Sequence, residues 1–484
     1  MERKLIFQKD MNLQTSYIRK PEIKMEDAAN FLPSKYLREK LPLPSVGEFE
    51  VIRHYTNLAN LNFCVDTNFY PLGSCTMKYN PKINEEVSKF EGFIDIHPYQ
   101  NIDTVQGALE LIYNLEKLLC EITGMSRFSF QASSGAQAEL VGMLMVKKYH
   151  KIRKAKKYKV IIPDSSHGTN PATAAMCGYK VIVIESTKDG LVDLDKLAAI
   201  CDDEIAAMML TNPNTLGLFE ENILEISDLL HKKGALLYYD GANFNALLGV
   251  TKPSLMGFDI VHLNLHKTFS TPHGCGGPGA GAVGVREELC EFLPVPLVEK
   301  DKKGRFYLNY KVRNSIGRVR SFYGNFSVLV KAYAYLVRLG EDGLNRVSHM
   351  AVLAANYLKA KLKDYYLPAS QKPCMHEVVF SCINQAKNGV STLDIAKRLI
   401  DYGFHPPTMY FPIVVKEALM IEPTETESKT TLDDFVKAMI EIDTQAKQAP
   451  HLLKNAPLTT PLKRVDEVKA ARFPVLKWQP ENLE

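Results

Sequence analysis

The sequence has no long apolar segment, no paired-cysteine motif and no strong excess of charge of either sign. No apolar run approaches the ~18 residues that would span a bilayer, and the first segment, MERKLIFQKDMN, is too charged for the apolar part of a signal peptide. With 59 basic and 55 acidic residues, the formal net charge is only +4, which argues against a protein that neutralises nucleic-acid phosphates. We therefore expect a cytoplasmic chain with neither a membrane nor a nucleic acid as partner.

The nine cysteines are odd in number and form no C-x-x-C pair and no zinc-ligand spacing. This pattern excludes the disulfide framework of a small secreted protein, gives no reason to expect a metal, and is typical of a reduced intracellular chain. Internal repeats and low-complexity segments are also absent from the sequence, which excludes a solenoid or a collagen-like rod.

What the sequence does contain is an ordinary globular composition, 46% hydrophobic and 24% charged over 484 residues, enough for two or three domains. Residues 1–60 are rich in Pro, Lys and Glu, and predict an N-terminal arm that lies on the main body or on a neighbour. Residues 61–330 predict a large α/β domain and residues 331–450 a smaller C-terminal α/β domain. Residues 451–484 predict an irregular tail.

In the large domain, short apolar segments alternate with amphipathic ones. Strands are expected at residues 127–131, 158–164, 180–186, 205–211, 235–242 and 258–267. Helices are expected at residues 105–124, 136–151, 170–179, 194–202, 221–234 and 326–365. In the third of these helices, Asn170 is the expected N-cap and Pro171 the first helical residue. This alternation predicts a mainly parallel sheet that is covered on both faces.

One stretch, residues 147–159, holds eight Lys or Arg residues. We interpret it as a solvated helix end and turn, and the alternative is a docking site for an acidic protein. Nucleic acid is disfavoured because no aromatic stacking platform accompanies the charges.

Ligands of open α/β sheets bind at the carboxyl ends of the strands, so the loops after the strands carry the candidate chemistry. After the first strand, small residues at 132–136 open a helix, whose N-terminus can bind a phosphate. Ser134 in this loop is equally well explained as an ordinary N-cap. His167, after the second strand, can present its ring to a flat ligand or be structural. Asp240, at the end of a later strand, can hold a ring nitrogen protonated or simply form a turn.

Lys267 follows the last expected strand, among aromatic, hydroxyl and glycine residues. Burial lowers the pKa of a lysine, so that its amine can form a Schiff base. Asp240 lies 27 residues earlier on the preceding strand, and together with the Ser-Gly loop the three features predict a site for pyridoxal phosphate. The stretch 279–284 matches G-x-G-x-x-G, but it does not follow a first strand. We interpret its glycines as letting the backbone pass close beside the cofactor.

At this point the chain resembles a known family, the pyridoxal-phosphate-carrying half of the glycine cleavage system P-protein. The resemblance covers about residues 50–430, and the segments PLGSCTMKYNP and HKTFSTPHG are long and specific. The matching stretches are residues 70–81, 163–174, 240–249, 264–281, 323–336 and 403–428.

The resemblance implies a type I fold of pyridoxal-phosphate enzymes and assigns roles at matching positions. Lys267 would form the Schiff base, Asp240 would pair with the pyridine nitrogen and His167 would stack on the ring. The phosphate would lie at Ser134, Gly135 and Ala136, and the remaining cofactor contacts would be Ala242, His266 and Thr268.

The resemblance also leaves several positions open. A segment that borders the substrate channel, or is a buried structural loop, carries the candidate substrate residues Tyr70, Ser74, Thr76 and Lys78. For the substrate carboxylate, Arg318 and Arg320 are only candidates. Three positions depart from the family pattern: Gln137 and Ala138 replace a frequent His and a usual Gly, and Cys275 replaces a Gly. We expect Cys275 to be a tolerated small residue, with a redox role as the alternative.

By resemblance, the expected activity is that of a glycine dehydrogenase (aminomethyl-transferring). Glycine would lose CO₂ and its aminomethyl group would pass to the lipoyl group of the small H-protein. A separate subunit 1 would be the partner, in a dimer of heterodimers. Two other interpretations remain, namely another type I pyridoxal-phosphate enzyme and a structural subunit that has lost its cofactor.

Overall fold

The structure is a computed structural model that describes residues 4–9, 30–37, 43–273 and 279–477. The chain divides into two compact units, Met1–Cys64 and Val65–Glu484. In the first unit, the main element is helix α1 (Glu48–Ala59), which is preceded by the single-turn 3-10 helices Ile6–Gln8 and Ser34–Tyr36. An ion pair of 3.4 Å between Lys9 and Glu50 ties the first turn to this helix.

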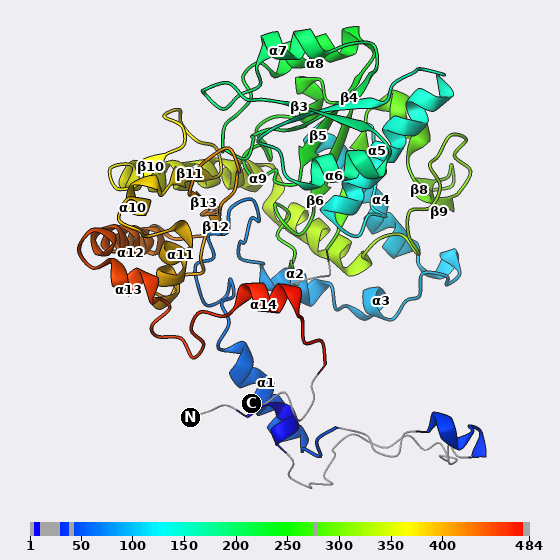
Figure 1. Cartoon of the computed structure of the whole chain (residues 1–484). Coiled ribbons are helices and arrows are strands. Elements are labelled where there is room, and N and C mark those ends of the chain that lie inside the picture. Colours follow the sequence, from blue (N-terminus) through cyan, green and yellow to red (C-terminus); the bar gives the residue numbers. More distant parts are fainter. Residues whose placement is uncertain (1–3, 10–29, 38–42, 274–278, 478–484) are drawn as a thin grey trace. The chain divides into compact units, whose positions relative to one another are not determined.

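The second unit is built on a seven-stranded sheet with the order β1-β7-β6-β5-β4-β2-β3. Its strands are β1 (Arg127–Ser129), β2 (Lys159–Pro163), β3 (Lys180–Ile184), β4 (Ile205–Thr211), β5 (Leu236–Gly241), β6 (Ile260–Asn264) and β7 (Gly281–Val285). All neighbours from β3 to β6 are parallel, whereas β7 runs antiparallel to both β6 and β1. The mainly parallel sheet is therefore confirmed (Figure 1).

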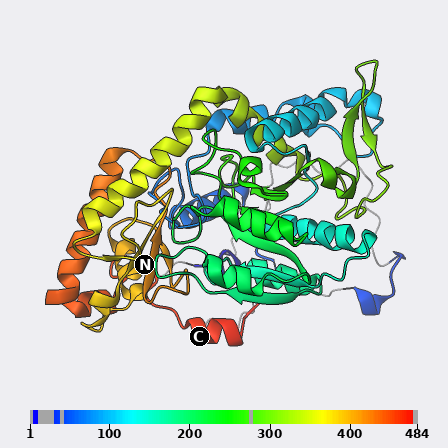
Figure 2. The same ribbon diagram turned by 90° about the horizontal axis from the view of Figure 1, so that it is seen from above.

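The strands are apolar throughout because both faces of the sheet are covered. Tyr239 and Leu237 of β5 belong to the hydrophobic core on one face, and Tyr238 and Leu236 belong to the core on the other. The covering helices are α4 (Gln106–Thr123), α5 (Gly135–Ile152), α6 (Thr169–Met176), α7 (Leu194–Ile200) and α8 (Ile223–Lys232). Side chains of α4, α7 and α8 belong to the same core as Tyr239, and those of α5 and α6 to the same core as Tyr238. Figure 2 shows the same ribbon from above.

The helix ends are set by local chemistry. Helix α4 ends at Gly124, whose φ of 72° is left-handed, as its sequence indicated. The predicted start of α6 is wrong: the helix begins at Thr169 with Gly168 as N-cap, two residues before the position expected from Asn170. The reason is that the Asn170 side chain is drawn into the interior, where its Nδ2 donates to the carboxylates of Glu139 and Asp240.

The glycines of 279–284 serve packing within the sheet. A Cβ on Gly281 would lie 2.7 Å from the Cβ of Ala138, and one on Gly284 would lie 2.3 Å from the ring of Phe128. Gly281 and Gly284 thus let β7 approach α5 and β1, and the expectation that these glycines let the backbone pass beside a cofactor stays a prediction.

The basic stretch 147–159 forms the end of α5 and the turn before β2, as expected. Its lysines are used within the fold: Lys159 pairs with Asp202 and Glu204, both at 2.6 Å. Lys157 donates to three backbone carbonyls, those of residues 203, 205 and 233.

Helix α9 (Phe326–Leu362) leads from the large sheet to the C-terminal region, and its position confirms the helix expected at 326–365. It bends at Gly340, whose φ of 60° and ψ of −172° are non-helical. Glycine adopts this conformation without the steric cost that a side chain imposes. Smaller elements before and after the large sheet are α2 (Lys82–Val87), α3 (Glu91–Ile94), β8 (Leu297–Lys300) and β9 (Phe306–Asn309).

The C-terminal region has its own antiparallel sheet, of order β10-β11-β13-β12, and its own hydrophobic core. The elements are β10 (Leu367–Pro368), β11 (Val378–Ser381), α10 (Ile383–Ala386), α11 (Thr392–Asp401), β12 (Thr408–Met409), β13 (Ala418–Ile421), α12 (Lys429–Gln448), α13 (Pro450–Lys454) and α14 (Glu467–Arg472). The tail, expected to be irregular, thus contains the short helices α13 and α14. No helix within the described ranges is long and apolar enough to cross a membrane.

Candidate active site

The candidate residues Lys267 and Asp240 meet at the carboxyl ends of neighbouring parallel strands. Asp240 lies near the end of β5, and Lys267 follows β6 by three residues. Both line a cavity of about 230 Å³. The other lining residues are Ser74, Gly135, Ala136, Glu139, His167, Thr169, Thr211, Thr215, Ala242, Asn243, Asn264 and His266.

The side chain of Lys267 is oriented by the segment that was expected to border a substrate channel. Its Nζ donates a hydrogen bond of 2.7 Å to the backbone carbonyl of Ser74. Ser74 has a left-handed φ of 60°, and its amide donates to the carboxylate of Glu377 at 2.8 Å. Two residues on, both the amide and the hydroxyl of Thr76 donate to Glu422. The two buried glutamates of the C-terminal region therefore fix the carbonyl that faces Lys267.

Asp240 is buried and lies among donors. Burial alone would raise the pKa of this carboxyl, but His262, the amide of Asn170, the backbone N–H of Ala242 and Lys267 together hold it below its ordinary value. Asn170 Nδ2 and the Ala242 amide each donate to it at 3.0 Å. Asp240 is thus held as an anion at the floor of the cavity.

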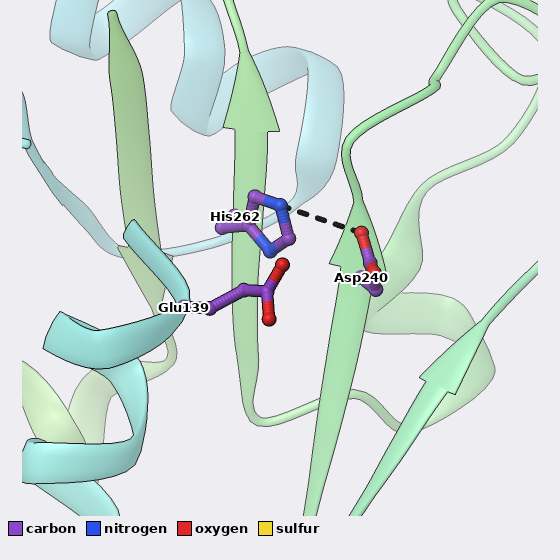
Figure 3. A group of neighbouring side chains, drawn as sticks. All are labelled: Glu139, Asp240 and His262. Carbon is purple, nitrogen blue, oxygen red and sulfur yellow. Dashed lines mark ion pairs between the residues drawn. The ribbon is translucent and has the colours of Figure 1, made fainter. Parts of the chain in front are cut away.

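Two residues beside Asp240 were missed from the sequence, Glu139 of α5 and His262 of β6 (Figure 3). His262 Nε2 lies 3.3 Å from Asp240 Oδ1, and its other ring nitrogen is 2.8 Å from the hydroxyl of Tyr238. Burial lowers the pKa of His262. Burial and the neighbouring Asp240 raise the pKa of Glu139 to about 7.

A signal for one of these two residues was present in the sequence. His262 interrupts an apolar strand, and a polar residue inside a buried strand needs a partner. Glu139 gave no such signal, because a glutamate on an amphipathic helix is normally solvated.

Two groups of side chains have the spacing of a metal site. The possible ligand atoms of Glu139, Asp240 and His262 lie within 4.8 Å of one another, as do those of His376, Glu377 and Glu422. This spacing would suit a metal ion, but hydrogen-bond donors already occupy the carboxylates in both groups.

His167 lies on the rim of the same cavity. Its Nδ1 is 2.9 Å from the hydroxyl of Thr169, and its ring makes an edge contact with Phe411 at 5.9 Å between centroids. Burial, opposed by Asp240 and reinforced by Lys267, lowers the pKa of His167. The ring is therefore neutral near pH 7.

The Ser-Gly loop forms the N-terminus of helix α5. Ser134 is the N-cap, and its hydroxyl accepts from the amide of Gln137, so the capping interpretation is confirmed. The amides of Gly135 and Ala136 belong to the first turn, where no intrahelical acceptor exists, and both residues line the cavity. Gln137, one of the departures, accepts from the amide and hydroxyl of Ser133 and so stiffens the loop. The other, Ala138, fits because it faces Gly281.

Several predicted residues do not line the cavity. Thr268 is buried, and its hydroxyl accepts from the amide of Phe244. Lys78 is buried among Asn245, Tyr335 and Glu425, the last at 2.7 Å. With Thr76 held by Glu422, these contacts favour the alternative of a structural loop for residues 76–78.

Three further predictions lie away from this cavity. Tyr70 stacks on His405 with ring centroids 3.6 Å apart. Arg320 donates to Asn325 at 3.1 Å, and Arg318 lies over the ring of Tyr310. His266, by contrast, does line the cavity, and burial and His273 lower its pKa to about 3. The prediction for Cys275 lies outside the described residues.

The donor set of the cavity fits pyridoxal phosphate. It combines an amine, a carboxylate and a neutral imidazole with the N-terminus of an 18-residue helix. Two buried polar atoms of lining residues, Thr211 Oγ1 and Asn264 Oδ1, have no hydrogen-bond partner in the described part of the chain. A Cβ on Gly135 would lie 2.5 Å from this Asn264 oxygen. Unsatisfied polar atoms and a helix start that only glycine leaves open are what a polar, phosphorylated ligand requires.

Comparison with known proteins gives relatives over the whole length. A protein from Caldanaerobacter subterraneus subsp. tengcongensis, called probable glycine dehydrogenase (decarboxylating) subunit 2, is 58% identical over 477 residues, 98% of each chain. A protein of the same name from Thermotoga maritima is 56% identical, covering 93% of this chain and 94% of the relative. The family described as glycine dehydrogenase, C-terminal domain, matches residues 347–459.

Solved structures show the same fold at low sequence identity. A glycine decarboxylase (P-protein) of the glycine cleavage system, in inhibitor-bound form, has a TM-score of 0.72 and 21% identity, over 85% of this chain and 94% of that chain. A glutamate decarboxylase from Lactobacillus brevis has a TM-score of 0.67 and 14% identity, over 87% and 98% of the two chains. These likenesses confirm the expected fold class, the type I fold of pyridoxal-phosphate enzymes.

Proposed function

This chain belongs to the family of glycine dehydrogenase (decarboxylating) subunit 2, and on that basis we propose that its Lys267 cavity binds pyridoxal phosphate and decarboxylates glycine. The observation that carries the proposal is the meeting of three groups in one cavity: the Lys267 amine, the Asp240 carboxylate and the N-terminus of α5. Each is complementary to one part of the cofactor, respectively the carbonyl, the ring nitrogen and the phosphate.

When bound, pyridoxal phosphate supplies a carbonyl for the lysine amine and a ring that accepts the electron pair left when CO₂ departs. The residues of this chain would do the rest. Asp240, kept anionic by its donors, would hold a proton on the ring nitrogen and so increase electron withdrawal by the ring. His167 would cover one face of the ring. The amides of Gly135 and Ala136 would bind phosphate oxygens at the positive end of the helix dipole.

The contact with Ser74 would support the role of the Lys267 amine in two ways. The carbonyl of Ser74 accepts a hydrogen bond from Nζ at 2.7 Å, so it aims the amine before a ligand arrives. The same carbonyl would accept a hydrogen bond from the free amine while glycine occupies the site. Pre-positioning of this kind lowers the entropic cost of bringing two groups together.

The overall reaction that we propose is a decarboxylating transfer. The carboxylate of glycine leaves as CO₂, and the aminomethyl carbon bonds to one sulfur of a lipoyl disulfide. The second sulfur keeps the electron pair of the broken S–S bond and takes up a proton. We propose lipoylated H-protein as the carrier of that disulfide, subunit 1 as the stable partner in a dimer of heterodimers, and the cytoplasm as the location.

The test is an absorbance spectrum of the purified chain with added pyridoxal phosphate, recorded before and after glycine, with and without subunit 1. We expect a Schiff-base band that shifts on addition of glycine, followed by glycine-dependent CO₂ release when lipoylated H-protein is present. A band that ignores glycine would point to another amino acid as substrate. The absence of a band would point to a structural subunit without cofactor, and either result would overturn the proposal.

A further inference from the structure

Glu139 is a buried acid that connects two residues of the proposed cofactor site. One carboxylate oxygen, Oε1, is 2.7 Å from the hydroxyl of Thr169, which in turn is 2.9 Å from His167 Nδ1. The other oxygen, Oε2, accepts from Asn170 Nδ2 at 3.0 Å, and the same nitrogen donates to Asp240 at 3.0 Å. Glu139 therefore stands between His167 and Asp240.

The two acids differ in the kind of groups around them. Asn170 gives one amide hydrogen to each, and Glu139 otherwise faces the neutral hydroxyls of Thr169 and Thr173. Asp240 accepts from the Ala242 amide, and His262 Nε2 lies 3.3 Å from it. The charged and titratable groups that face Glu139 are Asp240 and Tyr238 from β5, His262 from β6, His167 before α6, and Lys267 across the cavity. Lys267 and His262 favour the charge of Asp240, whereas the donors of Glu139 are neutral and its neighbour Asp240 opposes its charge, so a proton shared by the pair belongs on Glu139.

The path from Glu139 to His167 contains a single hydroxyl hydrogen, that of Thr169. If Glu139 is ionised, this hydrogen points at Oε1, and the short contact with Nδ1 then requires His167 to carry its proton on Nδ1. If Oε1 is protonated, Glu139 donates to the hydroxyl, and the hydroxyl donates to Nδ1. The Thr169 backbone amide, 3.2 Å from Nδ1, favours this second arrangement, which leaves the proton of His167 on Nε2.

From this geometry we propose that Glu139 is a positioning residue whose protonation selects the tautomer of His167, and with it whether His167 offers the ligand a donor or an acceptor. The ligand in question is the carboxylate of glycine or a polar substituent of the cofactor, so the functional part of this inference rests on the proposed function. A carboxylate needs the Nε2–H form. Because burial and Asp240 raise the pKa of Glu139 to about 7, the donor form of His167 (Nε2–H) would prevail below neutral pH and its acceptor form (Nδ1–H) above it.

The chain offers a close mimic of the protonated acid. In Glu139→Gln, the amide oxygen must take the Oε2 place, where Asn170 and Thr173 donate, so the NH₂ group faces Thr169 permanently. Thr169→Val removes the connecting hydroxyl without changing the shape of the side chain. As a matched control, Glu220→Gln alters another buried acid of raised pKa that accepts backbone amides and does not line this cavity.

The measurement is the ¹⁵N chemical shifts of His167 in selectively histidine-labelled, cofactor-free chain between pH 6.5 and 8.5, assigned with His167→Gln. We expect the unmodified chain and Glu220→Gln to change from Nε2–H to Nδ1–H as the pH rises. In Glu139→Gln, His167 should keep its proton on Nε2 at every pH, and in Thr169→Val the tautomer of His167 should show no step, that is, no change with pH. A step that persists in Glu139→Gln, or no step in the unmodified chain, would overturn the proposal.

A second readout uses the loaded enzyme. The KM for glycine should rise with pH through about 7 in the unmodified enzyme and stay flat in Glu139→Gln, with kcat changed less than KM. If the chain neither binds pyridoxal phosphate nor turns over glycine, the proposed function fails, but the ¹⁵N experiment on the cofactor-free chain still decides the tautomer.

Discussion

The backbone carbonyl of Ser74 accepts a hydrogen bond from Nζ of Lys267, although the two residues are 193 positions apart in the chain. The contact joins an early segment to the Lys267 amine, and the buried Glu377 and Glu422 hold that segment through hydrogen bonds to Ser74 and Thr76. The site therefore has walls from three distant parts of the sequence.

Replacement of Lys267 by Ala should abolish the Schiff-base band and glycine-dependent CO₂ release, because no other amine lines the cavity among the described residues. Lys267→Arg is the matched control for charge: it preserves the cation and a donor for Ser74, but cannot form the Schiff base. Absorbance spectra and CO₂ release decide the matter, and a band that survives in either variant would remove Lys267 from this role.

Replacement of Asp240 by Asn should reduce turnover by about 100-fold or more, the scale of losing one preorganised charge, while the fold is retained. The amide keeps the size of the carboxylate, so far-UV circular dichroism should be unchanged. CO₂ release at saturating glycine and cofactor is the measurement. Near-normal turnover would show that the ring nitrogen does not depend on this carboxylate.

Gly135→Ala should weaken binding of pyridoxal phosphate on the order of tenfold, because the new Cβ would lie 2.5 Å from Asn264 Oδ1 at the start of α5, where we propose that the phosphate binds. The control is Gly107→Ala in α4, where a Cβ meets nothing within 4 Å and alanine favours the helix. Titration of the cofactor band gives both affinities. Equal affinities in the two variants would argue against a phosphate at Gly135.

Glu139→Gln should stabilise the chain relative to the unmodified protein at alkaline pH. Burial, then Asp240, raises the pKa of Glu139 from 4.5 to about 7 in the folded state. Between these values the unfolded chain releases the proton and the folded chain keeps it, so folding becomes less favourable as pH rises through this window. Linkage gives a cost of at most about 3 kcal/mol, which the amide avoids.

The check on this stability prediction is urea unfolding of both proteins at pH 4.5 and pH 8. The difference in free energy of unfolding, variant minus unmodified, should increase with pH. A difference that stays constant would mean that Glu139 has an ordinary pKa in the folded protein.

Lys78→Met should destabilise the fold by about 3 kcal/mol, because it leaves Glu425 without its buried ion-pair partner. Burial would lower the pKa of Lys78, but Glu425 and Tyr335 more than offset this effect. Lys82→Met is the control. The side chains of Lys82 and its ion-pair partner Asp66 are both more than 45% exposed, and exposed pairs contribute little to the free energy of unfolding. Urea unfolding that gives the same loss for both variants would contradict the structural role of Lys78.

The sequence predicted the sheet and the Lys267–Asp240 pair because both depend on local order. Alternating strands and helices make a parallel sheet, and the carboxyl ends of β5 and β6 then bring the two residues together. The antiparallel strand β7 was not predicted, since GAVGV has little of the apolar pattern of a strand and its place depends on α5 and Phe128.

The side-chain networks could not be predicted in the same way. Thr76 binds Glu422, which is 346 positions later, and nothing near either residue in the sequence indicates the partner. Glu139 has the pattern of a surface charge on a helix, and only the fold shows that α6 covers it. The family resemblance named Thr268 and Lys78 as site residues. Both belong to segments that reach the cavity, but their side chains contact Phe244 and Glu425 instead of lining it.

The attachment of residues 76–79 to Glu422, Glu425 and Thr426 has a consequence for synthesis of the chain. The segment leaves the ribosome early, but its partners are made about 346 residues later, which at ordinary translation rates is a delay on the order of tens of seconds. During that time the carbonyl of Ser74 has neither Glu377 nor the C-terminal sheet to hold it. The large domain can therefore form its strands during translation, but the wall that aims Lys267 is completed only when almost the whole chain has been released.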